Sequence, residues 1–345
     1  MRRYGRMEFV MFKKIYSICL ICLLLITFSA VPIYAENGVV SFSVKAIIPS
    51  NQINKNLTYF DLKMQPNEKQ NLTVTIFNNT NEEIKIGMEL TSASTNGNGL
   101  IDYTSNSTPD ETLKTPLTQV ASLPENTITV SANDSKNVII QLDMPDTSFV
   151  GVILGGIILK EIDNDNSSNF EGLTLKNEYS YIIGVKLTEN EQDVAPELAL
   201  KSVKPSLINY RTAVVADIQN TQPTIIKGMQ VTGEIYKNNE TTIFKSSSNN
   251  IVDMAPNSTY AFPIDWKNQK LDPGDYRLHL TAVDGENKWE WDEVFTINKS
   301  SANQTNAESP YLPKTLPVIL YIILGIAIAA AVLTAGVLIG RRAHK

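Results

Sequence analysis

The chain has 345 residues and a formal charge of −6, from 30 lysines and arginines against 36 aspartates and glutamates. Its basic residues gather near the two ends, so residues 36–339 hold 22 basic and 35 acidic side chains, a net charge of −13. Proteins bind nucleic acid mainly by neutralising phosphate with lysine and arginine. The composition therefore excludes a nucleic-acid-binding protein.

The two cysteines, Cys19 and Cys22, both lie within the first 35 residues. If these residues are removed, the mature chain can form no disulfide framework, thiolate metal site or cysteine nucleophile. A secreted chain without disulfides depends on core burial and needs domains of ordinary size. About 280 residues outside a membrane predict two domains of roughly 100–200 residues each.

The N-terminus has the features of a secretory signal peptide. Lys13 and Lys14 precede an apolar run over residues 15–28, and the small residue Ala35 ends the segment. A basic start, a short apolar core and a small residue at the cut are typical of a cleaved signal. We therefore predict a signal peptide over residues 1–35.

Residues 36–190 predict a first β-domain. Short period-2 apolar runs bounded by Asn, Asp, Gly or Pro recur there, at 39–44, 72–77, 84–90, 138–142, 152–162 and 179–187. Such runs are typical of strands, and no long apolar period of 3.6 residues accompanies them. The exception is one short helix within 113–123, where Leu113, Leu117 and Val120 can share a face. The pattern predicts an all-β, immunoglobulin-like sandwich.

A long polar excursion runs from Asn96 to about residue 126. Loops of this length without regular structure are uncommon unless they bind something or are disordered. Amide and carboxylate side chains with one tyrosine ring can supply hydrogen bonds and a stacking surface for a glycan. The candidate ligand-binding residues here are Asn96, Asn98, Asp102 and Tyr103. The alternative is that the Asn-Gly pairs only form turns.

Three further candidates, Gly151, Gly155 and Gly156, lie at the start of the run 152–162. The segment lacks the Lys-Ser/Thr ending of a phosphate-binding loop. Glycine inside a strand marks a bulge or a close approach of another backbone or a ligand. We favour bulge or packing, with a ligand-facing groove as the alternative.

Residues 163–167 alternate oxygen-bearing side chains, as in the first half of a calcium loop. Ser168 and Thr174 stand where the helix-loop-helix site needs Gly and Glu. A solvated hairpin loop is therefore favoured over a weak calcium site. We predict no metal and no cofactor.

An acidic linker over 191–196 precedes a second set of short runs, at 198–203, 212–219, 229–236, 260–266, 276–283 and 289–297. About seven short strands in about 100 residues predict a second immunoglobulin-like sandwich over 197–299. Trp289 and Trp291 lie two residues apart and share one face of a strand. They are candidate partner-binding residues, and packing in the core or between domains is the favoured interpretation.

The C-terminal part combines a predicted stalk with a predicted membrane anchor. Residues 300–317 are polar over much of their length and predict a flexible stalk. Residues 318–339 are 22 residues without a charge, about 33 Å as a helix and enough to cross a bilayer core of about 30 Å. Arg341, Arg342 and Lys345 follow and place the tail, 340–345, in the cytoplasm. We predict a single-pass type I membrane protein with an extracellular ectodomain.

The segment Leu312-Pro313-Lys314-Thr315 resembles the start of a sortase sorting signal. Leu316 stands where such signals have glycine, and transpeptidation attacks the bond after the threonine. A retained membrane anchor is therefore favoured over a sortase-anchored adhesin.

No catalytic constellation is evident in the sequence, and we predict that the protein is not an enzyme. His279 alternates with Leu278 and Leu280, and no nucleophile-elbow motif is present. The alternative class is a wall-active glycoside hydrolase, which uses two carboxylates, one of them with a raised pKa. A sensor is disfavoured, because residues 340–345 leave no room for a cytoplasmic output domain.

Several segments together carry a family resemblance: residues 59–66, 78–80, 95–103, 144–145 and 149–157. With a signal peptide, a second β-domain and a terminal span, they resemble the WxL-interacting proteins of Gram-positive bacteria over nearly the whole chain. The resemblance implies a first domain that binds peptidoglycan and a second that binds host ligands such as an extracellular-matrix protein. It also implies WxL-domain surface proteins as partners, a place in the cell membrane at the cell wall, and no enzymatic activity.

Overall fold

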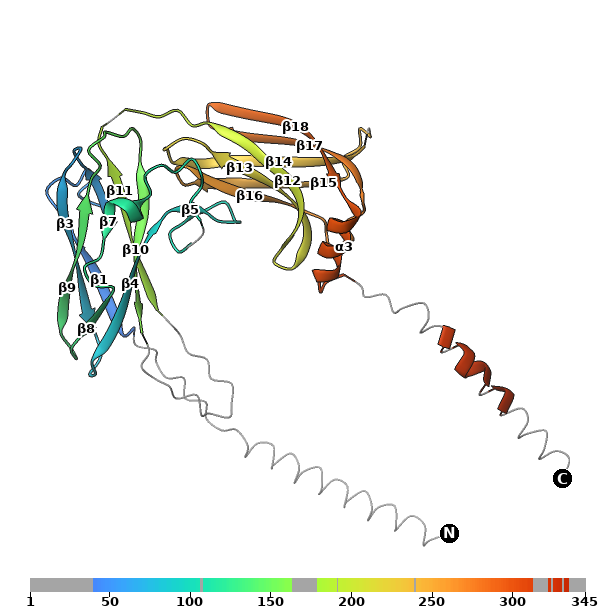
Figure 1. Cartoon of the computed structure of the whole chain (residues 1–345), viewed down its shortest axis with the longest axis horizontal. Helices are drawn as coiled ribbons and strands as arrows, with labels where there is room; N and C mark the ends of the chain where they lie inside the picture. The colour runs from blue at the N-terminus through green and yellow to red at the C-terminus, as the bar shows by residue number, and fades with distance from the viewer. Residues whose placement is uncertain are drawn as a thin grey trace, which may run out of the picture. The chain divides into compact units, whose positions relative to one another are not determined.

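The computed structural model describes residues 40–105, 108–162, 179–190, 192–238, 240–312, 322–323, 325–330 and 332–334. Two groups of β-sheets make up this part of the chain, each around its own apolar core (Figure 1). The predicted all-β chain of sandwich type is thereby confirmed. The predicted signal peptide, 1–35, and the calcium-like loop, 163–167, lie outside the described residues.

The first sandwich is formed by two sheets. One has the order β1-β3-β9-β7, with the bounds Phe42–Ile47, Lys69–Asn78, Ser135–Asp143 and Ala121–Ser122. The other has the order β2-β11-β10-β4-β8, with the bounds Phe60–Lys63, Ser180–Thr188, Ile153–Glu161, Ile84–Ser92 and Thr127–Val130. Along β3, the buried residues Leu72, Val74 and Ile76 alternate with more exposed ones, as the period-2 pattern predicts.

The polar excursion has regular structure of its own. β5 (Ser94–Thr95) and β6 (Ile101–Asp102) pair as a short antiparallel hairpin. The expected helix is present but short, because α2 covers only Leu117–Val120 and buries Leu117 and Val120 against the first core.

The second sandwich also has two sheets. Their orders are β12-β13-β16 and β15-β14-β17-β18. The bounds, in chain order from β12 to β18, are Leu198–Ile208, Arg211–Asn220, Ile226–Lys237, Lys245–Met254, Ser258–Asp265, Gly274–Asp284 and Asn287–Ile297. Each of the twelve runs predicted as strands in the two domains overlaps a strand of the structure.

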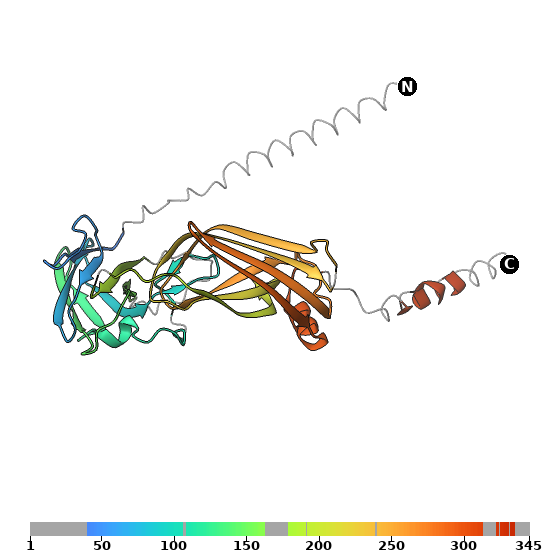
Figure 2. The same ribbon diagram turned by 90° about the horizontal axis from the view of Figure 1, so that it is seen from above.

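The prediction of a flexible stalk over residues 300–317 is corrected by the structure. The segment begins as a helix that docks on the second sandwich. α3 covers Lys299–Glu308, and the Asn298 side chain caps it by accepting a hydrogen bond from the Ser301 N–H at 2.8 Å. Ala302 and Thr305 are buried. Both views, Figures 1 and 2, show α3 at one end of the second sandwich. A polar helix of this length is marginal alone, so its docking supplies the stability that composition does not reveal.

Among the described residues, no helix is both long enough and apolar enough to cross a bilayer. The predicted span at 318–339 is described only at 322–323, 325–330 and 332–334. The membrane span therefore stays a prediction from the sequence.

Gly155 tests how tightly the first sandwich packs around α2. A Cβ added there would lie 2.2 Å from the Thr91 carbonyl oxygen and 2.5 Å from Leu117 Cδ2. We expect Gly155→Ala to lower the free energy of unfolding by about 1–3 kcal/mol, because overpacking a filled site shifts the backbone. Urea unfolding measures this.

Gly97→Ala is the matched control, because an added Cβ there meets nothing within 4 Å. This variant should stay within about 0.5 kcal/mol of the parent. Equal stability of the two variants would show that β4 and α2 separate freely enough to admit a methyl group.

Candidate functional site

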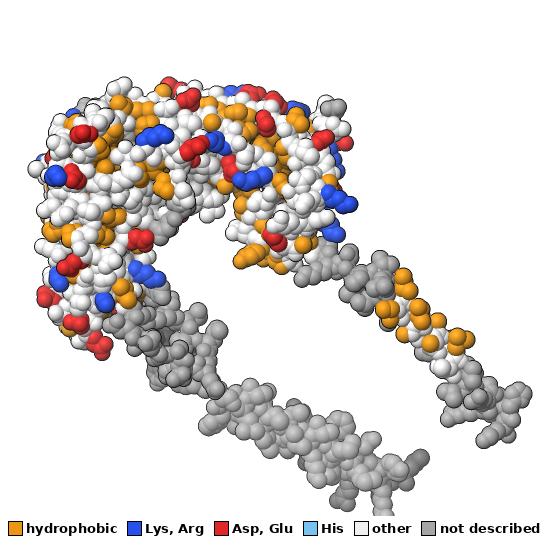
Figure 3. Space-filling view, viewed as in Figure 1, with side chains coloured by type: hydrophobic (Ala, Val, Ile, Leu, Met, Phe, Trp, Pro, Cys, Tyr) orange, Lys and Arg blue, Asp and Glu red, His pale blue; other side chains and the backbone are white. Residues whose placement is uncertain are grey.

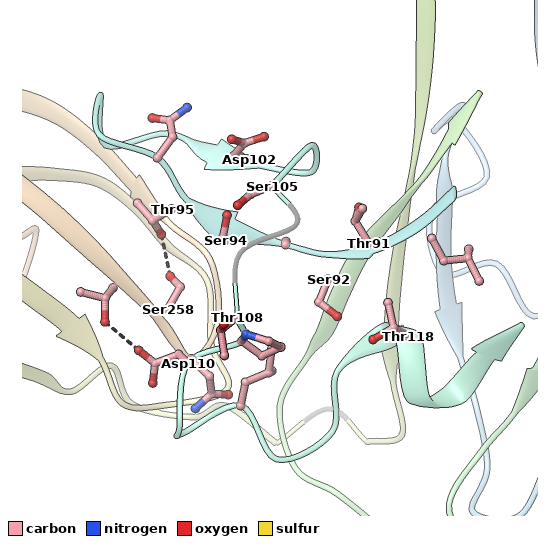
Figure 4. Close-up of a pocket in the computed structure, with 17 residues that line it drawn as sticks. Thr91, Ser92, Ser94, Thr95, Asp102, Ser105, Thr108, Asp110, Thr118 and Ser258 are labelled. Carbon is pink, nitrogen blue, oxygen red and sulfur yellow. Dashed lines mark hydrogen bonds between the residues drawn. The ribbon is translucent and has the colours of Figure 1, made fainter. Parts of the chain in front are cut away.

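A polar pocket of about 500 Å³ lies where the end of β4 passes into β5 (Figure 4). Its floor is the segment 90–96, and Asp102, Ser105 and the segment 108–110 form further walls. Thr118 of α2 and the turn before β16 complete it. The lining residues are Leu90, Thr91, Ser92, Ala93, Ser94, Thr95, Asn96, Asp102, Ser105, Thr108, Pro109, Asp110, Leu113, Thr118, Asn257, Ser258 and Thr259.

Hydroxyl and amide groups dominate this lining. Nine of the lining residues are serine or threonine, two are asparagine and two are aspartate, while lysine, arginine and aromatic side chains do not occur among them. Hydroxyls and amides both donate and accept hydrogen bonds. The pocket therefore suits a neutral ligand rich in hydroxyl and amide groups and offers no cationic side chain to a phosphate.

Ser92 supplies an unused hydrogen-bonding group in this lining. Its Oγ is buried and has no hydrogen-bond partner within the described part of the protein. Buried polar atoms in folded proteins nearly always have a partner, so an exception needs an explanation. Because this Oγ is closed to solvent, a ligand or ordered water in the pocket supplies the missing bond only if the lining opens slightly.

Asp110 ties the excursion to the second sandwich. Its Oδ1 accepts hydrogen bonds from the Gln219 side chain at 2.6 Å and from the Thr112 N–H and hydroxyl at 3.0 and 2.8 Å. Its Oδ2 accepts one from the Thr259 hydroxyl at 2.6 Å. Burial alone raises the pKa of Asp110, but these hydrogen bonds outweigh it and leave the pKa below its usual value.

A second tie is a buried relay of hydroxyl groups. Thr95 Oγ1 accepts a hydrogen bond from the Ala255 N–H at 3.0 Å and lies 2.6 Å from Ser258 Oγ, which donates to the Ala255 carbonyl at 2.8 Å. All three residues are buried. One wall of the pocket thus belongs to the second sandwich, and the two sandwiches build the site together.

The predicted residues Asn96, Asn98 and Asp102 make hydrogen bonds that chiefly hold the conformation of the excursion. Asn96 Oδ1 accepts from the backbone N–H groups of Asn98 and Leu100 at 2.9 and 3.2 Å. Asp102 Oδ1 accepts from the Thr104 N–H and hydroxyl at 2.7 and 2.6 Å. The Asn98 carbonyl accepts from the Asn249 side chain at 3.0 Å. Of the three, Asn96 and Asp102 also line the pocket.

Tyr103 and Gly156 lie together on the outer face of the first sandwich. A Cβ on Gly156 would meet Tyr103 Cβ at 3.1 Å, and Gly156 faces Gly184 across the sheet, where Tyr59 is the neighbour. Burial, and secondarily Tyr59, raise the pKa of Tyr103. The glycines therefore make room for tyrosine rings, and Tyr103 lies outside the pocket lining.

Gly151 and Gly155 are both positions of close backbone approach. Gly151 has φ +88°, and an added Cβ would lie 2.2 Å from the Pro223 carbonyl oxygen. That oxygen accepts a hydrogen bond from the Val152 N–H at 2.8 Å, which joins the sandwiches again. Packing, which the sequence favoured, is thus what both glycines serve in the structure.

Trp289 and Trp291 lie on β18, the edge strand of its sheet, opposite Ala282 and Leu280 of β17. Both indoles are partly buried and pack against the second core. Neither lines the polar pocket, and their role in partner binding stays a prediction.

Sequence reasoning missed the residues that matter most to the pocket: Ser92, Asp110, Thr118 and the turn 257–259. Only Asp110 carried a signal, because Thr-Pro-Asp followed by Thr112 is a turn sequence whose carboxylate bonds the backbone two residues later. Its partners on β13 and β16 are distant in sequence and left no local pattern.

Two all-β sandwiches that share a pocket lined for hydrogen bonding define a chain of paired binding domains. Two family descriptions match it: the peptidoglycan binding domain of the WxL Interacting Protein over residues 42–161 and the host binding domain over 170–307. Together these matches cover most of the chain. The chain belongs to the WxL-interacting protein family, which confirms the resemblance seen in the sequence.

No curated protein matches the chain. Among solved structures, the E. coli chaperone DraB is 12% identical, with 75% of this chain and 96% of that chain covered and a TM-score of 0.29. The Salmonella enterica SafA pilin in complex with the SafB chaperone gives 10% identity, coverages of 75% and 99% and a TM-score of 0.31.

Asp110 makes the docking of the excursion dependent on pH. Because its folded-state pKa is depressed, its carboxylate contributes stability above its ordinary pKa of about 4, and that contribution is lost as the pH falls through the lower folded-state value. We expect the free energy of unfolding to fall less between pH 5 and pH 3 in Asp110→Asn than in the parent. Chemical unfolding over a pH series measures the two slopes, and parallel slopes would contradict the assignment.

Proposed function

We propose that the protein is a non-enzymatic binding protein of the Gram-positive cell surface whose first sandwich holds peptidoglycan in the polar pocket. The family descriptions support peptidoglycan as the ligand of the first domain. The observation that carries the proposal is the lining of hydroxyl and amide groups in a space of about 500 Å³. Peptidoglycan presents sugar hydroxyls, N-acetyl groups and peptide amides, which are the complementary partners.

Hydrolysis is the competing function, because Asp102 and Asp110 both line the pocket. A glycoside hydrolase needs one carboxyl group with a raised pKa to act as general acid. The pKa of Asp110 is instead lowered, and both of its oxygens accept hydrogen bonds from the protein. This arrangement favours binding over bond cleavage.

We further propose that the second sandwich engages a protein partner, either a WxL-domain surface protein or a host ligand, and that residues 318–339 anchor the chain in the membrane. The family description of a host binding domain supports the first point. The charge-free run of 22 residues before Arg341 supports the second. Leu312, the first residue of the sorting-like segment, is buried at 6% exposure, which disfavours its presentation to a transpeptidase.

The test of wall binding is retention of the intact ectodomain on purified peptidoglycan stripped of teichoic acid. The informative variant is Ser92→Ala with Thr118→Val, since Ser92 Oγ has no internal partner and Thr118 is exposed on α2. Two hydrogen bonds of about 0.5–1.5 kcal/mol each predict a loss of retention of roughly 5- to 150-fold. Neither change removes a bond on which the described fold depends.

Thr73→Val is the matched control, because Thr73 lies on β3 in the other sheet of the same sandwich. It should bind as the parent does. Unchanged retention of the Ser92/Thr118 variant would place the wall-binding surface elsewhere, and loss of turbidity of a wall suspension would favour the hydrolase.

A further inference from the structure

The end of the second sandwich that carries α3 is built differently from its other end. The end that carries α3, the C-terminal pole, consists of α3 and the turns 209–210, 240–244 and 266–273. Strand pairing places these turns together, because Ile208 pairs with Arg211, Ala213 with Asp265 and Lys237 with Tyr276. The opposite end, at 220–226 and 254–258, contacts the first sandwich.

The chain leaves this pole from a fixed point. The Asn306 side chain bonds both the N–H and the carbonyl of Leu271, at 2.8 and 2.9 Å, and the Ser309 hydroxyl donates to the Tyr210 carbonyl at 2.9 Å. Ser309 and Leu312 are buried. The path up to residue 312 is therefore part of the sandwich and not a free tether.

The remaining tether to the proposed anchor is short. Five residues, 313–317, separate Leu312 from the apolar run that begins at Val318. Even fully extended, the connection spans at most about 20 Å. Since the headgroup layer occupies about 5–8 Å on each side of the hydrocarbon core, the pole can never be far from lipid headgroups.

The pole exposes the side chains that favour such a layer. Tyr210, Tyr311 and Ile243 are 70%, 55% and 48% exposed, and Figure 3 shows hydrophobic side chains gathered beside the point where the sandwich ends. Arg211 lies over the Tyr311 ring, with Cζ 5.2 Å from its centroid. Tyrosine is enriched at membrane–water interfaces, where its ring and hydroxyl meet both environments.

Tyr210 is also held in a costly backbone conformation. It has φ +64° in the turn between β12 and β13, after Asn209 at φ +50°. A turn of this kind prefers Asn-Gly, and a bulky residue at positive φ is an outlier that points to a role beyond the turn itself.

We propose that the C-terminal pole rests in the headgroup layer of the bilayer that anchors the chain, with Tyr210 and Tyr311 as interfacial contacts. This inference rests on the proposed membrane anchor. Charge does not drive the contact, because the pole mixes signs: Arg211, Lys267, Lys270 and Lys299 against Glu240, Asp265, Asp272, Asp275 and Glu308. The short tether and the exposed rings carry it.

The test uses the full chain in phosphatidylcholine vesicles that contain a spin-labelled quencher lipid. Residues 36–345 contain no cysteine, so with Cys19 and Cys22 removed or replaced, one introduced cysteine carries one fluorophore. Pro310→Cys and Thr241→Cys place the probe at exposed positions of the pole, and Asn250→Cys places it on exposed β15 near the other end. We expect quenching of the probes at 310 and 241 but not of the probe at 250.

Replacing the two rings separates contact from mere proximity. In the Pro310→Cys chain, Tyr210→Asn with Tyr311→Ser should abolish most of the quenching, and Asn suits the positive φ of the turn. Ile251→Ser, at a residue 68% exposed on β15, is the matched control and should change nothing. Equal quenching with and without the tyrosines would overturn their role.

The anchor and the docking fail in different ways. If the chain does not float with the vesicles, the proposed anchor is wrong and the docking falls with it. If the chain floats but the probe at 310 is quenched no more than the probe at 250, the anchor stands and the docking is overturned.

Discussion

A few buried hydrogen bonds hold the two sandwiches in contact, and the geometry of the site depends on that contact. Thr95, Ala255 and Ser258 form a closed relay in which each hydroxyl both donates and accepts. Breaking one member would leave the others buried without partners, which costs more than the bond itself contributes. Gly151 adds a second constraint, since only a residue without a side chain lets its backbone approach the Pro223 carbonyl.

The polar pocket exists because this contact holds. Its floor belongs to the first sandwich, while Asn257, Ser258 and Thr259 come from the second. Asp110 and Glu111 connect the excursion to the second sandwich. Asp110 accepts hydrogen bonds from that sandwich, and Glu111 forms an ion pair with Lys201 of β12. A ligand in the pocket would therefore contact both sandwiches, so recognition by the first domain and its orientation on the second are physically linked.

The sequence predicted the fold class and twelve of the described strands, but not β2, β8 or β15, and it predicted much less of the site. Every apolar run with period 2 became a strand, because alternation reflects one buried face. β15 (Lys245–Met254) was not predicted, because serines and asparagines fill its first half. Its strand form depends on pairing with β14. α3 was not predicted either, because its stability comes from docking on the second sandwich and not from its own sequence pattern. The glycines and Asn96 were candidate ligand-binding residues, and that role stays a prediction. In the structure the glycines allow close packing, and Asn96 Oδ1 accepts backbone hydrogen bonds. The buried, unpartnered hydroxyl of Ser92 had no local signature.

The two ends of the second sandwich have opposite physical character, and this orders the molecule. One end is closed by buried hydroxyl bonds to the first sandwich, whereas the other exposes Tyr210 and Tyr311 beside a clamped chain exit. Buried bonds fix orientation, and exposed rings only gain by leaving water. The excursion is bonded to one end of the second sandwich through Asp110, and α3 holds the chain exit at the other end. The two segments with the weakest sequence signals therefore fix what each end of this sandwich contacts.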